Sequence, residues 1–236
     1  MEISEIKQTA DKVDGWLSNR EGPLLYTLAK NCRGRGAIVE IGSWKGKSTI
    51  WLGNGSKAGN KNMIFAIDPH TGSSEHKELY NNVSTFEEFK KNIENAGVAD
   101  AITPIVRTSE DAVKEFAAPV ELIFIDGAHE YESVKLDFEL WFPKVIEGGI
   151  MAFHDTVGFE GPQKVVEEYV YKSKNFRIVS FVDSITFAEK VGKNSLTDRL
   201  RNRYVLFLKS AYEFAGSLHL PKQINELGKK IAGLLQ

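Results

Sequence analysis

Apolar runs of strand length recur along the middle of this chain, and segments of helical period separate most of them. Seven runs fit strands: Ala37 to Ile41, Asn62 to Asp68, Ala101 to Val106, Pro119 to Asp126, Gly148 to His154, Phe176 to Val182 and Ile185 to Lys190. Because strands and helices alternate through the first five runs, these strands are predicted to lie parallel in one doubly wound sheet. The last two runs, one tight turn apart, predict an antiparallel hairpin. The pattern therefore predicts an α/β fold with a mostly parallel, seven-stranded sheet.

Helical patterns precede and follow these strands and divide the chain into three parts. Residues 1–35 predict an N-terminal helical cap, with a break near Gly15 and a second helix that begins near Pro23. Residues 36–192 form the predicted central domain. Residues 193–236 form a basic amphipathic tail, predicted as two helices that divide near Pro221.

The tail combines an apolar stripe with an excess of basic residues. The stripe comprises Leu200, Tyr204, Phe207, Leu208, Ala211 and Phe214. From Lys193 onward there are eight basic and three acidic residues, although the whole chain carries a formal charge of −2. We expect the stripe to pack on the domain or on a second subunit, which would make a homo-oligomer. Contact of a basic amphipathic helix with an anionic membrane surface is the less favoured alternative.

Composition limits the class of protein and its compartment. With 236 residues, 42% of them hydrophobic, the chain can bury a full core, and no apolar run approaches the ~20 residues of a membrane span. A single cysteine, Cys32, and a polar first segment unlike a signal peptide predict a cytoplasmic location. The near-neutral charge gives no overall attraction to nucleic acid, so no such partner is expected.

The stretch AIVEIGSWKGKST, from Ala37 to Thr49, is the strongest candidate for a ligand site. It predicts a buried strand, a turn at Gly42 and Gly46, and a helix whose first turn holds Ser48 and presents free amides to a ligand. Glu40 is unusual, because a carboxylate near the end of an apolar strand needs a partner. A ligand with a positive charge or a hydroxyl group would supply one.

Three nucleotide-type ligands could use such a turn. A nicotinamide site would have the spacing G-x-G-x-x-G, whereas the spacing here is G-x-x-x-G. The segment from Gly42 to Ser48 is one residue shorter than a P-loop, and Glu40 would repel a phosphate. S-adenosylmethionine (SAM) carries a sulfonium and no phosphate, and therefore suits an acidic strand end. A glycine turn that only packs a helix is the remaining alternative.

Two further strand ends carry residues that could reach an adenosine. Asp68 ends the second predicted strand, where an acid contacts the ribose hydroxyls in βαβ ligand sites. Ser109 follows the third strand, at the edge where open α/β sheets bind ligands. The long polar loop from His70 to Val83 leaves the same edge and could form a lid.

Carboxylates end two adjacent central strands, at Asp126 and at Asp155. Two hard oxygen ligands, completed by waters and a substrate oxygen, suit Mg²⁺. Bound Mg²⁺ would orient a substrate hydroxyl and lower its pKa. His129 lies three residues after Asp126 and could take the hydroxyl proton as general base. Local roles in turns are the alternative for all three side chains.

Four segments, EIGSWKGKST, AIDPHTG, LIFIDGAHEY and GGIMAFHDT, resemble in order and spacing the class I SAM-dependent O-methyltransferases. The resemblance covers about Val39 to Lys190. It is strongest to the branch that includes sugar O-methyltransferases of macrolide biosynthesis and cephalosporin-cluster homologues, and the chain is also similar to catechol-type enzymes. The resemblance implies a Rossmann-like, SAM-binding methyltransferase domain over residues 36–192, with the tail as a helical appendage.

The resemblance also implies roles for individual residues. The SAM contacts would be Glu40, Gly42, Ser43, Gly46, Ser48, Asp68, Ser109 and Asp126. Asp126 and Asp155 occupy the positions of two metal ligands of catechol-type enzymes. Those enzymes have an Asn where Thr156 stands and a Lys base at the position of His129. Macrolide-sugar enzymes have a His base, but an acid where this chain has His154. The third protein ligand therefore stays open between His154 and Thr156, unless the metal is absent.

These observations predict a SAM-dependent, Mg²⁺-assisted O-methyltransferase that acts on a hydroxyl of a small molecule. The hydroxylated acceptor follows from the base and metal arrangement, whereas a sugar in glycan or natural-product biosynthesis follows from the resemblance alone. Two alternatives belong to other classes. One is a nucleotide-triphosphate-binding module that uses the near-P-loop, and the other is a SAM-binding scaffold without catalysis.

Overall fold

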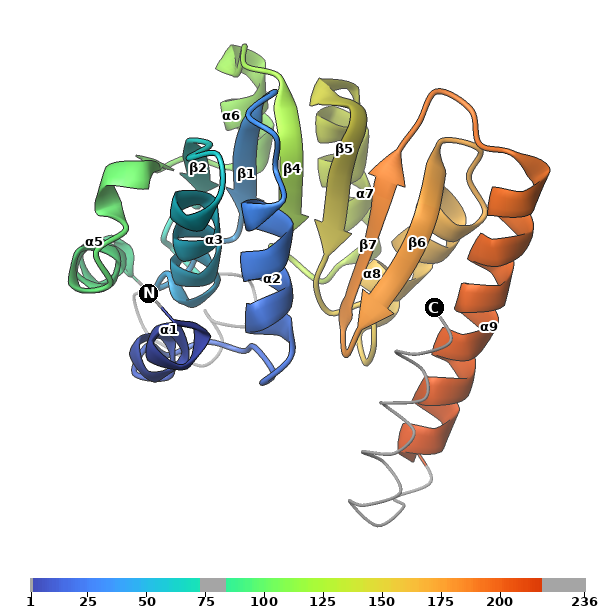
Figure 1. Ribbon diagram of the computed structural model, residues 1–236, viewed down its shortest axis with the longest axis horizontal. Helices are drawn as coiled ribbons and strands as arrows, with labels where there is room; N and C mark the ends of the chain where they lie inside the picture. Colours follow the sequence, from blue (N-terminus) through green and yellow to red (C-terminus); the bar gives the residue numbers. More distant parts are fainter. Residues whose placement is uncertain (1, 73–83, 218–236) are drawn as a thin grey trace.

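The computed structural model describes residues 2–72 and 84–217 and contains a seven-stranded sheet (Figure 1). The strands are β1 (Ala37–Ile41), β2 (Ile64–Ile67), β3 (Ile102–Ile105), β4 (Val120–Ile125), β5 (Val145–Phe153), β6 (Phe176–Val182) and β7 (Ile185–Lys190). Their order across the sheet is β3-β2-β1-β4-β5-β7-β6. Strands β1 to β5 pair in parallel, and β7 runs antiparallel to β5 and β6. The predicted fold class and the terminal hairpin are confirmed.

Helices cover both faces of the sheet (Figure 1). One face is covered by α1 (Ile3–Ala10), α2 (Glu21–Lys30), α3 (Lys47–Ala58) and α5 (Phe86–Asn95). The other is covered by α6 (Ser109–Glu115), α7 (Tyr131–Trp141), α8 (Glu160–Val165) and the π-helix η3 (Val166–Tyr171). Two short 3₁₀ helices, η1 (Ala99–Ala101) and η2 (Phe142–Lys144), precede β3 and β5. Helices α1 and α2 fall within residues 1–35, and the division of the chain into cap, central domain and tail stays a prediction.

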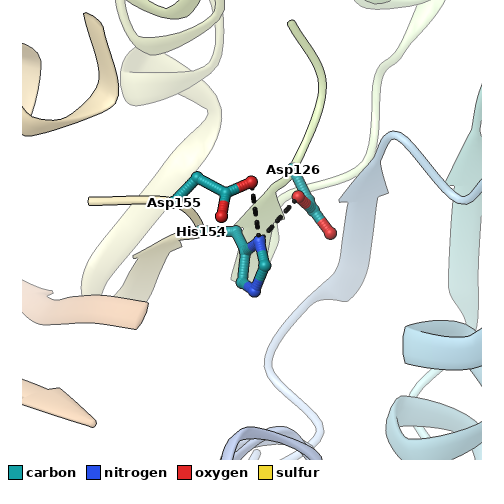
Figure 2. A group of neighbouring side chains, drawn as sticks. All are labelled: Asp126, His154 and Asp155. Atoms are coloured by element: carbon teal, nitrogen blue, oxygen red, sulfur yellow. Dashed lines mark ion pairs between the residues drawn. The ribbon is translucent and has the colours of Figure 1, made fainter. Parts of the chain in front are cut away.

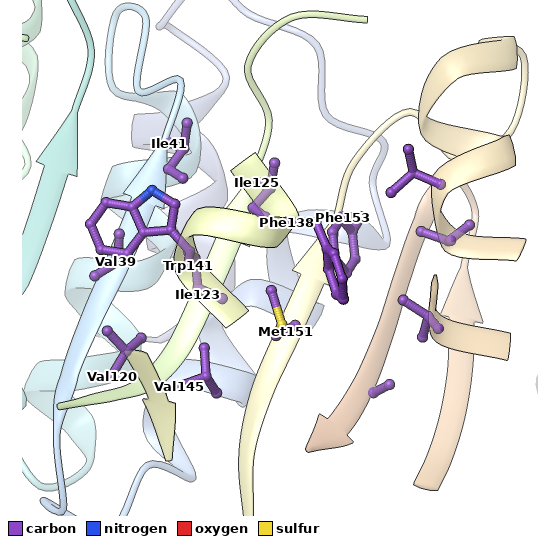
Figure 3. Packing of buried hydrophobic residues seen from close by; sticks show 14 of the residues in the cluster. Val39, Ile41, Val120, Ile123, Ile125, Phe138, Trp141, Val145, Met151 and Phe153 are labelled. Carbon is purple, nitrogen blue, oxygen red and sulfur yellow. The ribbon is translucent and has the colours of Figure 1, made fainter. Parts of the chain in front are cut away.

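The core lies in two layers, one on each side of the sheet. On one side, Val39 of β1 packs in the same cluster as Phe138 and Trp141 of α7 (Figure 3). On the other side, Ile38 packs in a cluster with Leu25 of α2. Strands β1 and β4 are buried along their whole length. Burial on both faces explains why these strands are continuous apolar runs in the sequence.

The start of β5 differs most from the sequence-based prediction. Helix α7 ends at Trp141, because Pro143 lies in the 3₁₀ helix that follows, and β5 begins at Val145, three residues before the predicted start at Gly148.

The strand order reverses between β1 and β4, which lie side by side in the sheet. The backbone ladder continues past the strand ends there. The Asp126 amide donates to the Ile41 carbonyl at 2.8 Å, and the His154 amide donates to the Ile125 carbonyl at 2.9 Å. These bonds place Gly42, Asp126 and His154 next to one another at the carboxyl edge, where open α/β sheets bind ligands.

The last described helix, α9 (Leu196–Ser217), runs along β6 and η3 (Figure 1). Its inward face contains Asn202, Val205 and Lys209, all of them buried. Most of the apolar stripe that we expected to pack on the domain faces away from it, whereas Leu208 of this stripe packs against the core. The exposed fractions of Leu200 and Phe207 in this stripe are 70% and 68%.

Hydrogen bonds explain which face of α9 packs against the rest of the protein. The Asn202 amide donates to the Phe176 carbonyl at 3.0 Å, and the Lys209 ammonium donates to the Thr156 carbonyl and to Glu213. Because buried carbonyl groups need partners, the face that supplies them packs inward.

Packing of the stripe on a second subunit or a membrane stays a prediction. The second tail helix, and residues 73–83 of the predicted lid, lie outside the described residues. None of the described helices is long and apolar enough to cross a membrane.

Candidate active site

The turn after β1 is shaped by close backbone contact with the end of β4. Gly42 has a left-handed φ of 86°, and a Cβ atom there would lie 1.9 Å from the Asp126 carbonyl oxygen. Gly46 has a φ of 92° and is the N-cap of α3, where a Cβ atom would lie 3.2 Å from the Phe89 ring. Both glycines are therefore required by the fold. Gly42 also lines two cavities. Gly46 lines neither of them, because it packs against the Phe89 ring.

Glu40 is fully buried, and α3 supplies a partner for its carboxylate. The Thr49 hydroxyl donates to Glu40 Oε2 at 2.5 Å. Burial raises the pKa of Glu40 to about 8, although hydrogen bonds from Ser48 and Thr49 oppose the rise. Direct contact between Glu40 and a ligand stays a prediction.

A cavity of about 350 Å³ lies over the ends of β1, β4 and β5, and two serines of the glycine turn line it. Ser43 is 1% exposed, and its Oγ makes no hydrogen bond to any described residue. Ser48, in the first turn of α3, lines the same cavity. Because a buried hydroxyl without a partner is rare, Ser43 marks a place for a polar ligand.

A second cavity, of about 240 Å³, adjoins the first and shares the walls formed by Gly42, Trp44, Asp126 and Gly127. Asp68 and Ser109 line it, so the structure brings these two predicted residues together.

Hydrogen bonds hold both of these side chains in place. Backbone amides of Trp44 and His70 donate to the two oxygens of Asp68 at 2.7 and 2.6 Å. Each oxygen keeps a second lone pair that can accept a hydrogen bond from a ligand hydroxyl. Trp141 Nε1 donates to Ser109 Oγ at 2.8 Å.

Asp126, His154 and Asp155 converge beside the first cavity (Figure 2). His154 Nδ1 lies 3.0 Å from Asp126 Oδ1 and 3.0 Å from Asp155 Oδ2. One potential ligand atom from each residue lies within 4.8 Å of the others. Thr156, the alternative third ligand, donates its hydroxyl to the Ser184 carbonyl at 2.8 Å instead. The structure therefore favours His154 as the third group of the cluster.

The cluster balances negative and positive charge. Burial opposes the charge on His154, but Asp126, Asp155 and Glu21 outweigh it and raise the pKa of this histidine well above its usual value. Burial raises the pKa of Asp126 against the attraction of His154. Burial acts in the same direction on Asp155, but hydrogen bonds from His129 and His154 hold the pKa of that carboxyl below its usual range. These carboxylates thus stabilise the positive charge of protonated His154.

His129 lies beside this cluster, on the wall of the first cavity. Its Nε2 atom is 2.9 Å from Asp155 Oδ2, and its ring lies over Phe159 with centroids 4.0 Å apart. A carboxylate on one ring nitrogen orients an imidazole and stabilises the imidazolium that forms when it takes a proton. The contact therefore suits a general base.

Backbone strain is present at the same place. Trp44 and Asp155, which both line the first cavity, have left-handed φ values of 47° and 55°. Such conformations in residues other than glycine cost ~1–3 kcal/mol each and cluster at functional sites.

The N-terminal cap adds residues to the site that no sequence pattern indicated. Trp16, between α1 and α2, lines the first cavity, and its ring centroid lies 6.5 Å from that of Trp44. Lys47 Nζ donates to the Gly15 carbonyl at 3.0 Å, which joins this segment to the start of α3. The break near Gly15 was visible in the sequence, but it does not indicate the direction in which the segment turns.

Comparison with known proteins places these features in a family. Residues 39–156, half of the chain, match a family model described as Methyltransferase domain. The protein y4gI of Sinorhizobium fredii is 30% identical over 147 residues, which are 62% of this chain and 16% of that protein. A catechol O-methyltransferase of Mycobacterium tuberculosis is 30% identical over 115 residues, 48% of this chain and 46% of the relative.

A solved structure shares the fold. The O-methyltransferase TomG from Streptomyces achromogenes, in complex with SAM, superposes with a TM-score of 0.58 at 20% identity. The match covers 80% of this chain and 89% of that one. The chain spans less than two thirds of the length of either curated relative.

Proposed function

The chain belongs to the methyltransferase domain family, and from that premise we propose that it transfers a methyl group from SAM to a hydroxyl oxygen of a small molecule. The observation that carries the proposal is the pair of adjoining cavities at the carboxyl edge of the sheet. One contains an acid suited to a ribose, and the other contains a histidine paired with a carboxylate. A donor and an acceptor could therefore meet at the shared wall.

The donor would occupy the smaller cavity and extend past Gly42. Asp68, held by two backbone amides, would accept hydrogen bonds from the ribose hydroxyls. The sulfonium would then lie near Asp126 on the shared wall, and the amino-acid end near Ser43 and Ser48. The Ser43 hydroxyl, which has no hydrogen-bond partner among the described residues, supports this placement.

On the acceptor side, the substrate hydroxyl would lie between His129 and the acidic cluster. Its oxygen attacks the methyl carbon, the bond between carbon and sulfur breaks, S-adenosylhomocysteine leaves, and His129 takes the proton. Because SAM is already activated, the protein mainly supplies alignment and a base.

The cluster also fits a divalent cation. Two carboxylates and one imidazole offer oxygen and nitrogen donors, and one such atom from each of Asp126, His154 and Asp155 lies within 4.8 Å of the others. These three residues would hold the cation, for which the sequence suggests Mg²⁺. When bound, the cation would lower the pKa of the acceptor hydroxyl.

The walls of the larger cavity support a ring-shaped acceptor. Trp16, Trp44 and Phe159 contribute aromatic surface, which contacts the apolar face of a sugar or an aromatic ring. A sugar is the acceptor class that we propose, on the basis of the family resemblance. The relative named catechol O-methyltransferase supports a hydroxylated acceptor in more general terms.

Calorimetric titration of SAM into the full chain, with and without Mg²⁺ and with ATP as control, tests the donor. We expect micromolar binding of SAM and none of ATP. Asp68→Ala should weaken SAM binding about tenfold or more, at ~1.4 kcal/mol per factor of ten. The matched control is Asp100→Ala, which removes an exposed carboxylate paired with Lys57.

Two results would replace the proposal. Binding of ATP in place of SAM would favour a nucleotide-triphosphate module. SAM binding without methyl transfer to any member of a panel of sugars and other hydroxylated acceptors would favour a SAM-binding scaffold.

A further inference from the structure

Glu21, the first residue of α2, lies in the N-terminal cap but extends its carboxylate to the acidic cluster. Its Oε2 atom is 3.5 Å from His154 Nε2, and both side chains are buried. Three hydrogen bonds hold the carboxylate in place. The Ser18 amide donates at 2.7 Å, and the amide and hydroxyl of Ser184 donate at 2.8 and 2.7 Å. Two separate segments of the chain, at Ser18 and at Ser184, therefore position the Glu21 carboxylate beside His154.

The two nitrogens of His154 consequently face different partners. Nε2 faces Glu21, whereas Nδ1 lies between the carboxylates of Asp126 and Asp155 (Figure 2). A cation bound between the two aspartates would replace the hydrogen on Nδ1, and the Glu21 carboxylate would then accept the hydrogen that Nε2 keeps. Metal-binding histidines in proteins typically have this arrangement, with a carboxylate on the outer nitrogen.

The donor set also bears on which cation would bind. Mg²⁺ is bound by oxygen ligands, whereas imidazole nitrogen suits first-row transition metals such as iron, nickel and zinc. In this cluster one of the three protein ligands would be a nitrogen atom. A site made only of carboxylate and amide oxygens would lack this preference.

We propose that Glu21 fixes the tautomer of His154 and that Asp126, His154 and Asp155 thereby form a site selective for a first-row transition-metal dication over Mg²⁺. Glu21 is a positioning residue in this proposal, since it acts through His154. The inference rests on the proposed function, because it specifies the cation that would assist methyl transfer.

The test uses metal binding rather than activity. The full chain is freed of metal with a chelator, and Co²⁺ is titrated while its visible absorption is recorded, with Mg²⁺ as competitor. We expect Co²⁺ to bind at least tenfold more tightly than Mg²⁺. Glu21→Gln should weaken Co²⁺ binding about 10- to 100-fold. His154→Asp, which makes all three ligands oxygen donors, should reverse the preference toward Mg²⁺.

The matched control for Glu21→Gln is Glu121→Gln. Glu121 is also 3% exposed and also accepts backbone hydrogen bonds, from Arg33 and Arg35. Its variant should lose stability without a change in Co²⁺ affinity. Equal affinity for Co²⁺ and Mg²⁺, or unchanged Co²⁺ affinity in Glu21→Gln, would overturn the proposal.

SAM titration of the same samples separates this inference from the proposed function. Intact SAM binding without any Co²⁺ binding would overturn only the metal site. Loss of SAM binding in the unaltered chain would contradict the proposed function itself. If Glu21→Gln fails to fold, the comparison between His154→Asp and the unaltered chain still decides the selectivity.

Discussion

The carbonyl oxygen of Asp126 lies 1.9 Å from the position that a Cβ atom on residue 42 would occupy, so Gly42 lets β1 and β4 end in direct contact. The same contact shapes the wall that the two cavities share. Any side chain at residue 42 must therefore separate the strand ends on which the proposed donor site depends.

We predict that Gly42→Ala destabilises the protein by ~1–3 kcal/mol through overpacking, in addition to the strain of a left-handed residue, and that it lowers SAM affinity. Gly97→Ala is the matched control, because Gly97 has a φ of 66° but no atom of the described residues lies within 4 Å of the added methyl group. Urea unfolding and SAM titration of both variants measure the effects. Equal losses of stability in the two variants would show that backbone strain alone accounts for the effect at residue 42.

The sequence was sufficient to predict where the residues that directly follow parallel strands lie. Asp126 and Asp155 could be placed together because the carboxyl ends of neighbouring parallel strands meet at one edge. Glu21 could not be placed, because it lies 133 residues from His154 and no periodic pattern connects the two. The inward face of α9 was also missed, since buried hydrogen bonds of Asn202 and Lys209 outweigh the apolar stripe there.

Glu40 should make stability depend on pH. Because its pKa in the folded state is about 8, above the ordinary value of 4.5, the folded state holds a proton that the unfolded chain releases. Stability should therefore fall as the pH rises from 4.5 to 8, by at most ~1.4 kcal/mol per pH unit. Glu40→Gln should remove this contribution, which urea unfolding of both proteins at pH 5 and pH 8 can measure. The same pH dependence in both proteins would rule out Glu40 as its source.

The orientation of α9 can be tested with a pair of truncations. Val205→Ala, on the buried face, should cost about 2 kcal/mol of stability, because it leaves a cavity beside β6. Phe207→Ala, on the exposed stripe, should change stability by less than about 0.5 kcal/mol, although the side chain is larger. Thermal unfolding of the two variants distinguishes the faces. A large loss in Phe207→Ala would show that the stripe is covered in solution, and light scattering would then show whether a second copy covers it.

The role of His129 as general base predicts a loss of turnover without a loss of donor binding. His129→Gln keeps a hydrogen-bond donor for Asp155 but cannot take the proton of the substrate hydroxyl at neutral pH. We expect kcat to fall ~10²–10⁴-fold with the first acceptor identified, while SAM affinity stays unchanged. His129→Lys should recover part of the loss, since the catechol-type enzymes that the chain resembles have a lysine base at this position. If kcat of the Gln variant stays within about fivefold of the unaltered protein, the proton must leave by another route, and the contact between His129 and Asp155 would then serve only to position the carboxylate.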